Sequence, residues 1–274
     1  MMISKELRDY IQKSFKRGHV ICLSGAGISY ESGIPTFRGQ GGLWERYDPA
    51  LYAHLEGLIQ LFKTNPRKVI DFIIDFYSVL LKAHPNPAHR ALAILEKENI
   101  LTSTITQNID GLHQEAGSRN VIELHGNAFR IRCNCAPDKT RVLEKDKIRE
   151  MIELLKNHKN SRIKILRVLS RYFPRCLNCG CRYRIDIVLF GEELAQDDLS
   201  RAYKELNNCN ILLIIGSSLV VYPAASLPLY AKVRGAQLIE INNEPSGLSD
   251  LCDYRILGAA GEILTEILSL LGYA

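Results

Sequence analysis

The chain of 274 residues lacks several features that would assign it to a class at once. No apolar stretch lies near its N-terminus, where charged residues occupy positions 5, 6, 8 and 9, so we expect no export signal. One long apolar stretch, 211–231, is broken by glycine, serine and proline, which predicts a strand, a loop and a helix instead of a membrane span. Internal repeats and low-complexity tracts are also absent. We expect a cytoplasmic protein, or a nuclear one in a eukaryote, without a membrane partner.

Disulfide bonds are not expected either, although the chain has eight cysteines, because a reducing compartment disfavours them. Three cysteines, at positions 22, 209 and 252, are isolated in apolar segments and are interpreted as small buried residues. The other five lie between positions 133 and 181 and are interpreted as metal ligands. With 46% hydrophobic residues, the chain can bury one large core, or a large domain with a small insert.

Short runs rich in β-branched residues alternate with helical segments, which predicts an α/β fold with a parallel sheet. The expected strands are 19–23, 100–106, 121–124, 211–215 and 237–241. Expected helices begin after Ser4 and span about 66–82, 87–98 and 261–271. Asn65 and Asn86 each precede a proline, an arrangement typical of a helix N-cap followed by the first helical residue.

The segment 24–39 follows the first expected strand and has the composition of a phosphate-binding loop. Its small residues Gly25-Ala26-Gly27 would let backbone N–H groups approach a pyrophosphate closely. The dinucleotide fingerprint G-x-G-x-x-G is only half met, because Tyr30 occupies the place of the third glycine. Further along, Phe37 and Arg38 offer a flat apolar face beside a cation, which suits a nicotinamide ring and a ribose phosphate. The alternative is an ordinary strand-to-helix turn.

Polar residues follow other expected strands at their carboxyl ends, where open α/β sheets bind ligands. Gln107, Asn108 and Asp110 follow the strand 100–106, and for Asp110 the alternative role is to cap the next helix. His125 follows the strand 121–124 and precedes Gly126. Because an imidazole titrates near neutral pH, His125 is the candidate general base, the alternative being a structural histidine.

Two cysteine pairs could form a closed tetrahedral thiolate site, which is typical of structural zinc. Cys176 and Cys179 have the C-x-x-C spacing, whereas Cys133 and Cys135 are one residue closer. This departure leaves Cys181 as an alternative to Cys135 for the fourth ligand.

Five motifs, in this order along the chain, give a specific resemblance. They are the loop 24–39, TQNIDGLH at 106–113, ELHG at 123–126, VLFGE at 188–192 and GSSLVVYPAA at 216–225. The chain resembles the sirtuins, the silent-information-regulator family of NAD-dependent protein deacylases. The resemblance runs from about residue 5 to the C-terminus and is interrupted only at about 138–172.

The resemblance implies a single catalytic domain over residues 1–274. Its large part would be a Rossmann-like sheet with helices on both faces, formed by about 1–27, 83–126 and 185–274. A smaller part would combine a helical module, about 28–82, with a zinc module, about 127–184.

The implied activity is NAD-dependent deacetylation of protein lysine, which releases nicotinamide and O-acetyl-ADP-ribose. NAD would be a consumed cosubstrate, and one zinc ion would be structural. By resemblance, His125 and Asn108 would be catalytic, and acyl-lysine peptides would bind at Val188, Phe190, Gly191 and Val220. The expected NAD-binding residues are Gly25, Ala26, Gly27, Ile34, Phe37, Arg38, Trp44, Gln107, Asn108, Ile109, Asp110, Gly216, Ser217, Ser218 and Asn242. ADP-ribosyl transfer or NAD hydrolysis at the same site is an alternative, and an NAD-sensing binding module is another.

One branch of the family removes acidic acyl groups with a tyrosine and an arginine three residues apart. By resemblance, Tyr77 corresponds to this tyrosine, whereas Leu80 stands at the place of the arginine. The expected preference is therefore for acetyl or longer apolar acyl groups.

The insert 138–172 is markedly basic, with eleven lysine and arginine residues against five acidic ones. Ile148, Met151, Ile152 and Leu155 recur at helical spacing and predict an amphipathic helix. A solvated helix packed on the zinc module is one interpretation. A surface for an acidic partner, either nucleic acid or another protein, is the other.

Overall fold

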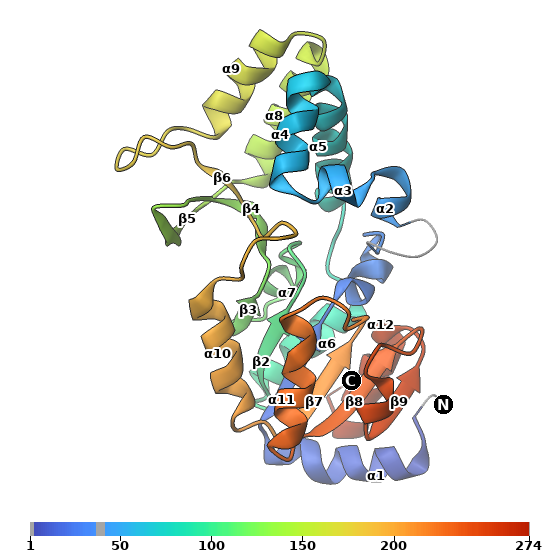
Figure 1. The fold of residues 1–274 in the computed structure, drawn as a ribbon. Helices are drawn as coiled ribbons and strands as arrows, with labels where there is room; N and C mark the ends of the chain where they lie inside the picture. The colour runs from blue at the N-terminus through green and yellow to red at the C-terminus, as the bar shows by residue number, and fades with distance from the viewer. Residues whose placement is uncertain (1–2, 37–41, 274) are drawn as a thin grey trace. The chain divides into compact units, whose positions relative to one another are not determined.

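The computed structural model describes residues 3–36 and 42–273, without the side chains of residues 44, 137 and 138, and it divides into two compact units (Figure 1). Unit 1 comprises Met1–Thr36, His84–Leu124 and Leu194–Ala274. Unit 2 comprises Phe37–Ala83 and His125–Glu193.

Unit 1 is built on a six-stranded parallel sheet with the strand order β3-β2-β1-β7-β8-β9. The strands are β1 (Val20–Ser24), β2 (Leu101–Thr106), β3 (Val121–Glu123), β7 (Ile211–Ile215), β8 (Gln237–Asn242) and β9 (Tyr254–Leu257). Strands β2 and β3 follow β1 on one side of it, whereas β7, β8 and β9 follow on the other side. The carboxyl ends of β1 and β7 are therefore a topological switch point, where such sheets bind their ligands.

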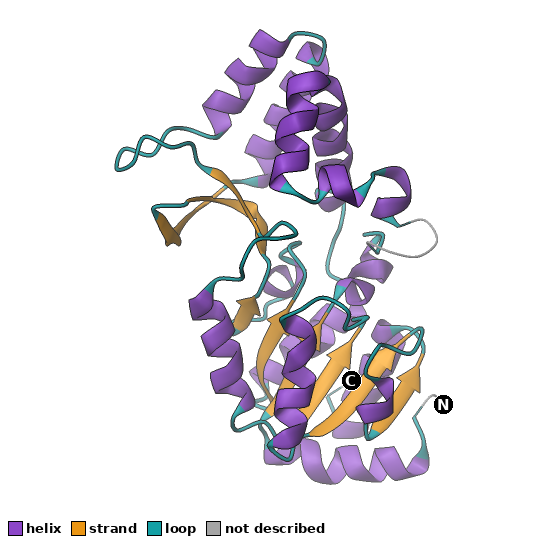
Figure 2. Ribbon diagram, in the orientation of Figure 1, coloured by secondary structure: helices purple, strands orange, loops and turns teal. Residues whose placement is uncertain are grey.

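Helices cover both faces of this sheet (Figure 2). They are α1 (Lys5–Ser14), α6 (Pro87–Lys97), α7 (Leu112–Glu115), α10 (Gln196–Leu206), α11 (Leu227–Val233) and α12 (Ala260–Leu271). Short helical segments are η1 (Phe15–Arg17), η2 (Ala26–Ser32), η3 (Ala224–Ser226) and η4 (Ser249–Leu251). Helices α1, α6 and α12 share one core with β1, β7 and β8. Every residue of β1 and of β7 is buried, and each large aliphatic side chain there contributes about 1.5–3 kcal/mol.

Unit 2 combines helices with a three-stranded antiparallel sheet of order β5-β4-β6. Its helices are α2 (Leu43–Arg46), α3 (Pro49–Tyr52), α4 (Leu55–Thr64), α5 (Pro66–Leu80), α8 (Lys145–His158) and α9 (Arg162–Tyr172). Its strands are β4 (Gly126–Cys133), β5 (Ala136–Val142) and β6 (Arg184–Ile187). Helix α8 packs between α5 and α9.

The five strands predicted from the sequence are confirmed to within one residue at each end. The three predicted N-caps are also confirmed, since the side chains of Ser4, Asn65 and Asn86 accept hydrogen bonds from the first turns of α1, α5 and α6. The amphipathic helix of the insert is α8, whose predicted apolar face is buried. No helix among residues 3–36 and 42–273 has the length and apolar character needed to cross a bilayer.

Candidate active site

The loops that follow β1 and β7 touch through glycines. A Cβ atom on Gly25 would lie 2.8 Å from the carbonyl oxygen of Gly216, and one on Gly27 would lie 2.7 Å from its Cα, both closer than real contacts allow. Gly216 itself has a φ of +59°, which favours glycine. The Gly27 N–H donates to the Gly216 carbonyl at 2.8 Å. These glycines are thus needed for loop packing at the switch point, whatever they also contribute to a ligand.

Asn108 is buried beside the β1 loop, and its backbone N–H donates to Thr106 Oγ1 at 3.0 Å. Its Nδ2 donates to the carbonyl oxygen of Gly25 and to Ser29 Oγ, each at 3.1 Å. Both amide hydrogens are thereby used, which leaves Oδ1 as the group for a ribose hydroxyl or a water molecule. This geometry suits the orienting role that the resemblance implies for Asn108.

Asp110 is also buried, and both of its carboxylate oxygens have partners. Oδ2 accepts the Ser29 hydroxyl at 2.7 Å, and Oδ1 accepts the Leu112 N–H at 2.9 Å at the start of α7. The capping role that we considered for Asp110 is therefore present. Burial raises the pKa of Asp110, against the hydrogen bonds from Leu112 and Ser29. A carboxylate offers about four acceptor positions, so it can still receive the amide of nicotinamide.

Ser217 joins residues from three strand ends. Gln107 Nε2 donates to Ser217 Oγ at 2.8 Å, and Asn242 Nδ2 donates to the Ser217 carbonyl at 3.1 Å. The expected NAD-binding residues Gln107 after β2, Ser217 after β7 and Asn242 at the end of β8 are thus held together. Ser218 is exposed, and Ala26, Ile34 and Ile109 are half-buried in the same unit.

The remaining expected NAD contacts cannot be placed. Phe37 and Arg38 lie outside the described residues. Trp44 lies in α2 of unit 2, and its side chain is not described.

Two neutral imidazoles lie behind these loops. His113 Nε2 is 2.9 Å from Ser24 Oγ, whose hydroxyl donates to Thr106 Oγ1 at 2.8 Å. His89 Nε2 is 3.4 Å from Ser29 Oγ. Burial lowers the pKa of His113 to about 3 and that of His89 to about 4, so both rings are uncharged at neutral pH. Thr106 Oγ1 thus accepts hydrogen bonds from the Ser24 hydroxyl and from the backbone N–H of Asn108. These bonds connect the buried His113 imidazole to Asn108.

His125 is positioned within unit 2 by its own backbone and by the next residue. Its carbonyl oxygen accepts the Val188 N–H at 3.0 Å, which places the candidate base beside the VLFGE motif. Gly126 has a φ of +77°, and a Cβ atom there would lie 2.1 Å from the carbonyl oxygen of Asp186. Glycine is therefore required for β4 to pair with β6 directly after His125.

The expected substrate residues are divided between the units. Val188, Phe190 and Gly191 lie in unit 2, where the Phe190 N–H donates to the Ala53 carbonyl at 2.9 Å. Val220 lies in unit 1 and is 47% exposed.

Four cysteine sulfurs form a compact cluster in unit 2. The Sγ atoms of Cys133, Cys135, Cys176 and Cys179 lie within 4.8 Å of one another, and three of their separations are 3.3, 3.4 and 3.6 Å. Tetrahedral zinc with Zn–S bonds of about 2.3 Å separates its sulfurs by about 3.8 Å. The cluster therefore fits one structural zinc ion. Among the described cysteines, Cys181 is not part of this group, and its backbone carbonyl accepts the Cys176 N–H at 2.7 Å.

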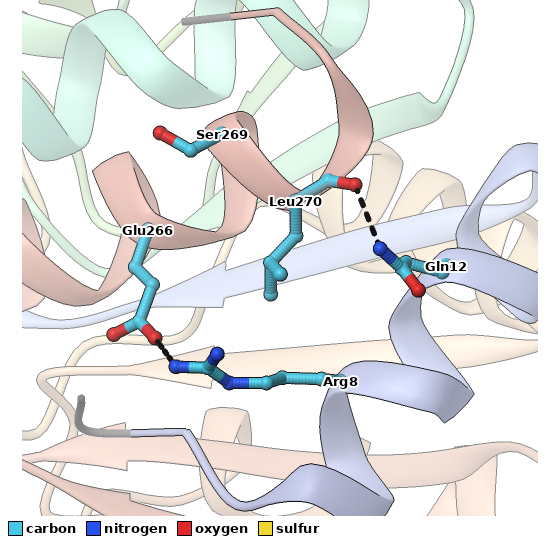
Figure 3. Close-up of a pocket in the computed structure, with 5 residues that line it drawn as sticks. All are labelled: Arg8, Gln12, Glu266, Ser269 and Leu270. Carbon is cyan, nitrogen blue, oxygen red and sulfur yellow. Dashed lines mark hydrogen bonds and ion pairs between the residues drawn. The ribbon is translucent and has the colours of Figure 1, made fainter.

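A surface pocket of about 540 Å³ lies apart from all of these motifs, between α1 and α12 (Figure 3). Arg8 and Glu266 form an ion pair across it, and Gln12 Nε2 donates to the Leu270 carbonyl at 3.4 Å. None of the expected site residues lines it.

Comparison with known proteins shows what these motifs belong to. The model of the Sir2 family matches residues 25–223. An NAD-dependent protein deacylase of Pyrococcus furiosus is 42% identical over 252 residues, which cover 92% of each chain. NAD-dependent protein deacylase 2 of Archaeoglobus fulgidus is also 42% identical, over 96% of this chain and 94% of the relative.

The chain belongs to the Sir2 family.

Solved structures agree with this assignment. One is a Sir2 homologue in complex with NAD, which is 37% identical with a TM-score of 0.77 and covers 98% of this chain and 94% of its own. Another is Sir2 with a p53 peptide and NAD⁺, which is 33% identical with a TM-score of 0.76 over the whole of both chains. The expected fold class, a parallel sheet with a zinc-binding module, is therefore confirmed for this Sir2 protein.

The structure places the two positions that were considered for acyl preference. Tyr77 is fully buried, and its hydroxyl donates to the Ala128 carbonyl at 2.9 Å, so it packs α5 against β4. Its hydroxyl is not open to an acyl group, and Leu80 is buried as well. Neither side chain forms a cationic site for an acidic acyl group, and the expected preference for acetyl or longer apolar groups stays a prediction.

Sequence analysis missed two residues that organise the site of this Sir2 protein. Ser29 bonds to Asn108, Asp110 and His89, and Thr106 joins Ser24 to the Asn108 backbone. The only available signal was their place inside motifs already recognised, since serine and threonine are common in turns.

We predict that the Cys135→Ser variant loses most of its bound zinc, because the mutation removes a ligand from the cluster. The Cys181→Ser variant should keep one zinc ion per chain, since its sulfur is outside the group. Elemental analysis of the purified proteins measures both. Loss of zinc in the Cys181 variant with full occupancy in the Cys135 variant would show that the ligand set is wrong.

We predict that unit 1 loses stability as the pH falls from 6.5 to 5. His89 and His113 have lower pKa values when folded than the ordinary 6.5, so the unfolded chain binds more protons in this range. Each ring should contribute a loss of about 1.6 kcal/mol over this interval. Urea unfolding at a series of pH values measures it.

The His113→Gln variant should show a shallower pH dependence than the wild type in that experiment. The His84→Gln variant is the matched control, because the His84 side chain is 78% exposed. Equal slopes for the His113 variant and the wild type would contradict the prediction.

Proposed function

We propose that this protein is an NAD-dependent protein-lysine deacylase, which transfers an acyl group from lysine to ADP-ribose and releases nicotinamide. The observation that carries the proposal is the arrangement of Asn108, Ser29 and Asp110 at the switch point of a chain that belongs to the Sir2 family. We propose that both units form one catalytic domain, because the expected residues are divided between them. The acyl-lysine peptide and NAD are its two substrates.

The proposed reaction begins when the carbonyl oxygen of acyl-lysine attacks C1′ of the nicotinamide ribose. The C1′–N bond breaks, nicotinamide leaves, and an alkylimidate forms. His125 then removes the proton of a ribose hydroxyl, which attacks the imidate carbon. Addition of water releases free lysine and leaves O-acyl-ADP-ribose.

Each proposed role follows from a contact already described. Asn108 Oδ1 orients the ribose or the water, because Nδ2 is held by Gly25 and Ser29. Asp110 accepts the nicotinamide amide. Ser217 and Asn242 hold the adenosine side of NAD, and the preformed hydrogen bond between them reduces the cost of ordering the site on binding. We propose that the Cys133, Cys135, Cys176 and Cys179 thiolates bind one structural zinc ion.

ADP-ribosyl transfer or NAD hydrolysis would use the same cleavage of nicotinamide. Deacylation is distinguished from these alternatives by whether the release of nicotinamide depends on an acylated peptide. A deacylase releases little nicotinamide without the peptide, whereas an NAD hydrolase does not need it.

We predict that the His125→Ala variant deacetylates an acetyl-lysine peptide at least about a hundredfold more slowly, since a general base contributes about 10²–10⁴ to a rate. The formation of O-acetyl-ADP-ribose, followed by mass spectrometry, measures the loss. Thermal unfolding and zinc content should stay those of the wild type. A folded variant with full turnover would refute the assigned role.

We also propose that nucleic acid is a second partner, bound by α9 of the basic insert. Three cations of helix α8 are paired within the helix, because Lys147, Arg149 and Lys156 each form an ion pair with an acidic residue three positions away. Helix α9 has four cations and no acidic residue. Phosphate backbones complement such a surface.

Two cations of α9 are the best candidates for contact with phosphates. Arg171 pairs with Glu150 at 2.8 Å, and Arg162 lies over the Phe62 ring. Lys164 and Arg167 are exposed and form no ion pair with the described residues. Ile163, on the same helix, is exposed, and its apolar side chain would contribute more to binding an acidic protein than to binding phosphates.

We predict that the protein binds a 20-base-pair DNA duplex with strong salt dependence and that Lys164→Glu with Arg167→Glu weakens this binding. Losing two phosphate contacts should reduce the slope of log affinity against log salt by about 2. Fluorescence anisotropy at several salt concentrations measures it. Arg149→Glu with Lys156→Glu on α8 is the charge-matched control and should change the affinity much less.

Two outcomes would contradict this partner. One is no duplex binding at low salt. The other is binding that falls equally in the α8 and α9 variants, which would indicate a diffuse effect of net charge. Binding to anionic lipid vesicles without binding to DNA would assign the surface to another ligand.

A further inference from the structure

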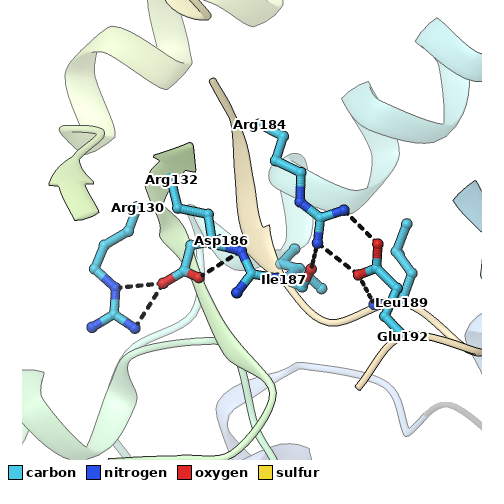
Figure 4. A network of polar contacts seen from close by, with 7 residues as sticks. All are labelled: Arg130, Arg132, Arg184, Asp186, Ile187, Leu189 and Glu192. Carbon is cyan, nitrogen blue, oxygen red and sulfur yellow. Dashed lines mark hydrogen bonds and ion pairs between the residues drawn. The ribbon is translucent and has the colours of Figure 1, made fainter. Parts of the chain in front are cut away.

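Arg184 and Glu192 bracket the segment 188–191, which contains the proposed substrate residues Val188, Phe190 and Gly191 (Figure 4). Arg184 Nη1 donates to Glu192 Oε1, and Nη2 donates to Oε2 at 2.6 Å. Each side chain is 23% exposed. A paired guanidinium and carboxylate of this kind is a strong, geometrically specific contact, and partial burial reduces its screening by salt.

The same two side chains also hold the backbone between them. Arg184 Nη2 donates to the carbonyl oxygen of Ile187 at 3.1 Å, and Glu192 Oε2 accepts the Leu189 N–H at 3.0 Å. Although burial acts to raise it, the pKa of Glu192 lies below its ordinary value because of Arg184 and the Leu189 amide. The carboxylate is therefore charged at neutral pH and holds both partners.

The neighbouring amides are satisfied as well. The Val188 N–H donates to the His125 carbonyl and the Phe190 N–H to the Ala53 carbonyl, at 3.0 and 2.9 Å. Three successive amides, at 188, 189 and 190, are therefore fixed by unit 2 itself, and only the Leu189 amide depends on the ion pair. Breaking the pair would free the middle of the segment while its two flanking amides remain attached.

We propose that Arg184 and Glu192 are positioning residues that preorganise the segment 188–191 for the acyl-lysine substrate. This inference rests on the proposed deacylase function. A segment that is ordered before binding does not lose conformational entropy when the peptide arrives, so the ion pair should act on peptide affinity. It should not act on NAD, whose proposed contacts are mainly in unit 1.

A second ion pair in the same sheet provides a matched control. Arg130 Nε donates to Asp186 Oδ2 at 3.1 Å and joins β4 to β6, as Arg184 and Glu192 join β6 to the segment (Figure 4). Its contacts with Asp186 do not reach residues 187–192. Loss of this pair tests the effect of weakening the sheet alone.

The experiment compares steady-state kinetics of the wild type, Glu192→Gln, Arg184→Lys and the Arg130→Gln control, with an acetyl-lysine peptide and NAD varied in turn. The KM for the peptide should rise by about tenfold in Glu192→Gln and less in Arg184→Lys, which keeps the charge but only one donor arm. The KM for NAD should change by less than about twofold in all of them. The control should leave the peptide KM unchanged.

The reversed pair, Arg184→Glu with Glu192→Arg, separates positioning from stability. It can restore the ion pair and the melting temperature, but a carboxylate at 184 cannot donate to the Ile187 carbonyl, and a guanidinium at 192 cannot accept the Leu189 N–H. The peptide KM should therefore remain raised. Recovery of the peptide KM together with the melting temperature would overturn the proposal.

Three other results are equally decisive. An unchanged peptide KM in Glu192→Gln, or an equal rise in the Arg130→Gln control, would reject the role of the pair while leaving deacylation in place. A wild-type protein that releases no nicotinamide with NAD and the peptide would instead reject the proposed function itself.

Discussion

The contact between the β1 and β7 loops is the constraint on which the site depends. The sheet changes direction between these strands, and Gly25, Gly27 and Gly216 let the two loops touch with no room for a side chain. A larger residue at any of these positions would push the loops apart. Because Asn108 is anchored to the Gly25 carbonyl, and Ser217 directly follows Gly216, that movement would reach residues on both sides of the switch point.

The polar groups behind these loops explain how the site remains rigid without charge. His89 and His113 are neutral, and they contact hydroxyl groups of Ser29 and Ser24 that are themselves hydrogen-bonded to the site. A buried imidazolium would have to be desolvated, whereas a neutral ring can share hydrogen bonds at little cost. Asp110 is the exception, a buried carboxylate that is supported by a hydroxyl and a helix amide. The network therefore provides one carboxyl acceptor in an otherwise uncharged setting.

Much of this organisation could be predicted from the sequence, because long apolar strands, N-caps and motif order are local signals. The strand ends and the three N-caps agree with the structure for that reason. Helix α9 was missed because arginine and lysine obscure its apolar face, and β9 was missed because an edge strand of four residues has a weak pattern. The burial of Tyr77 could not be predicted, because spacing along a helix does not tell which side chain packs against a distant strand. The bonds of Ser29 and Thr106 depend on segments about 80 residues apart, which no local pattern records.

His125 lies at a chain connection between the two units. Leu124, the last residue of its segment in unit 1, donates its N–H to the Thr106 carbonyl of β2 at 2.9 Å. The next residue is His125, whose carbonyl accepts the Val188 N–H in unit 2. One peptide bond therefore joins Leu124, which is bonded to β2, with His125, which is bonded to the proposed substrate segment 188–191. Strand β2 is the strand that precedes Asn108. The proposed base therefore lies where the chain passes from the parallel sheet of unit 1 into the antiparallel sheet of unit 2.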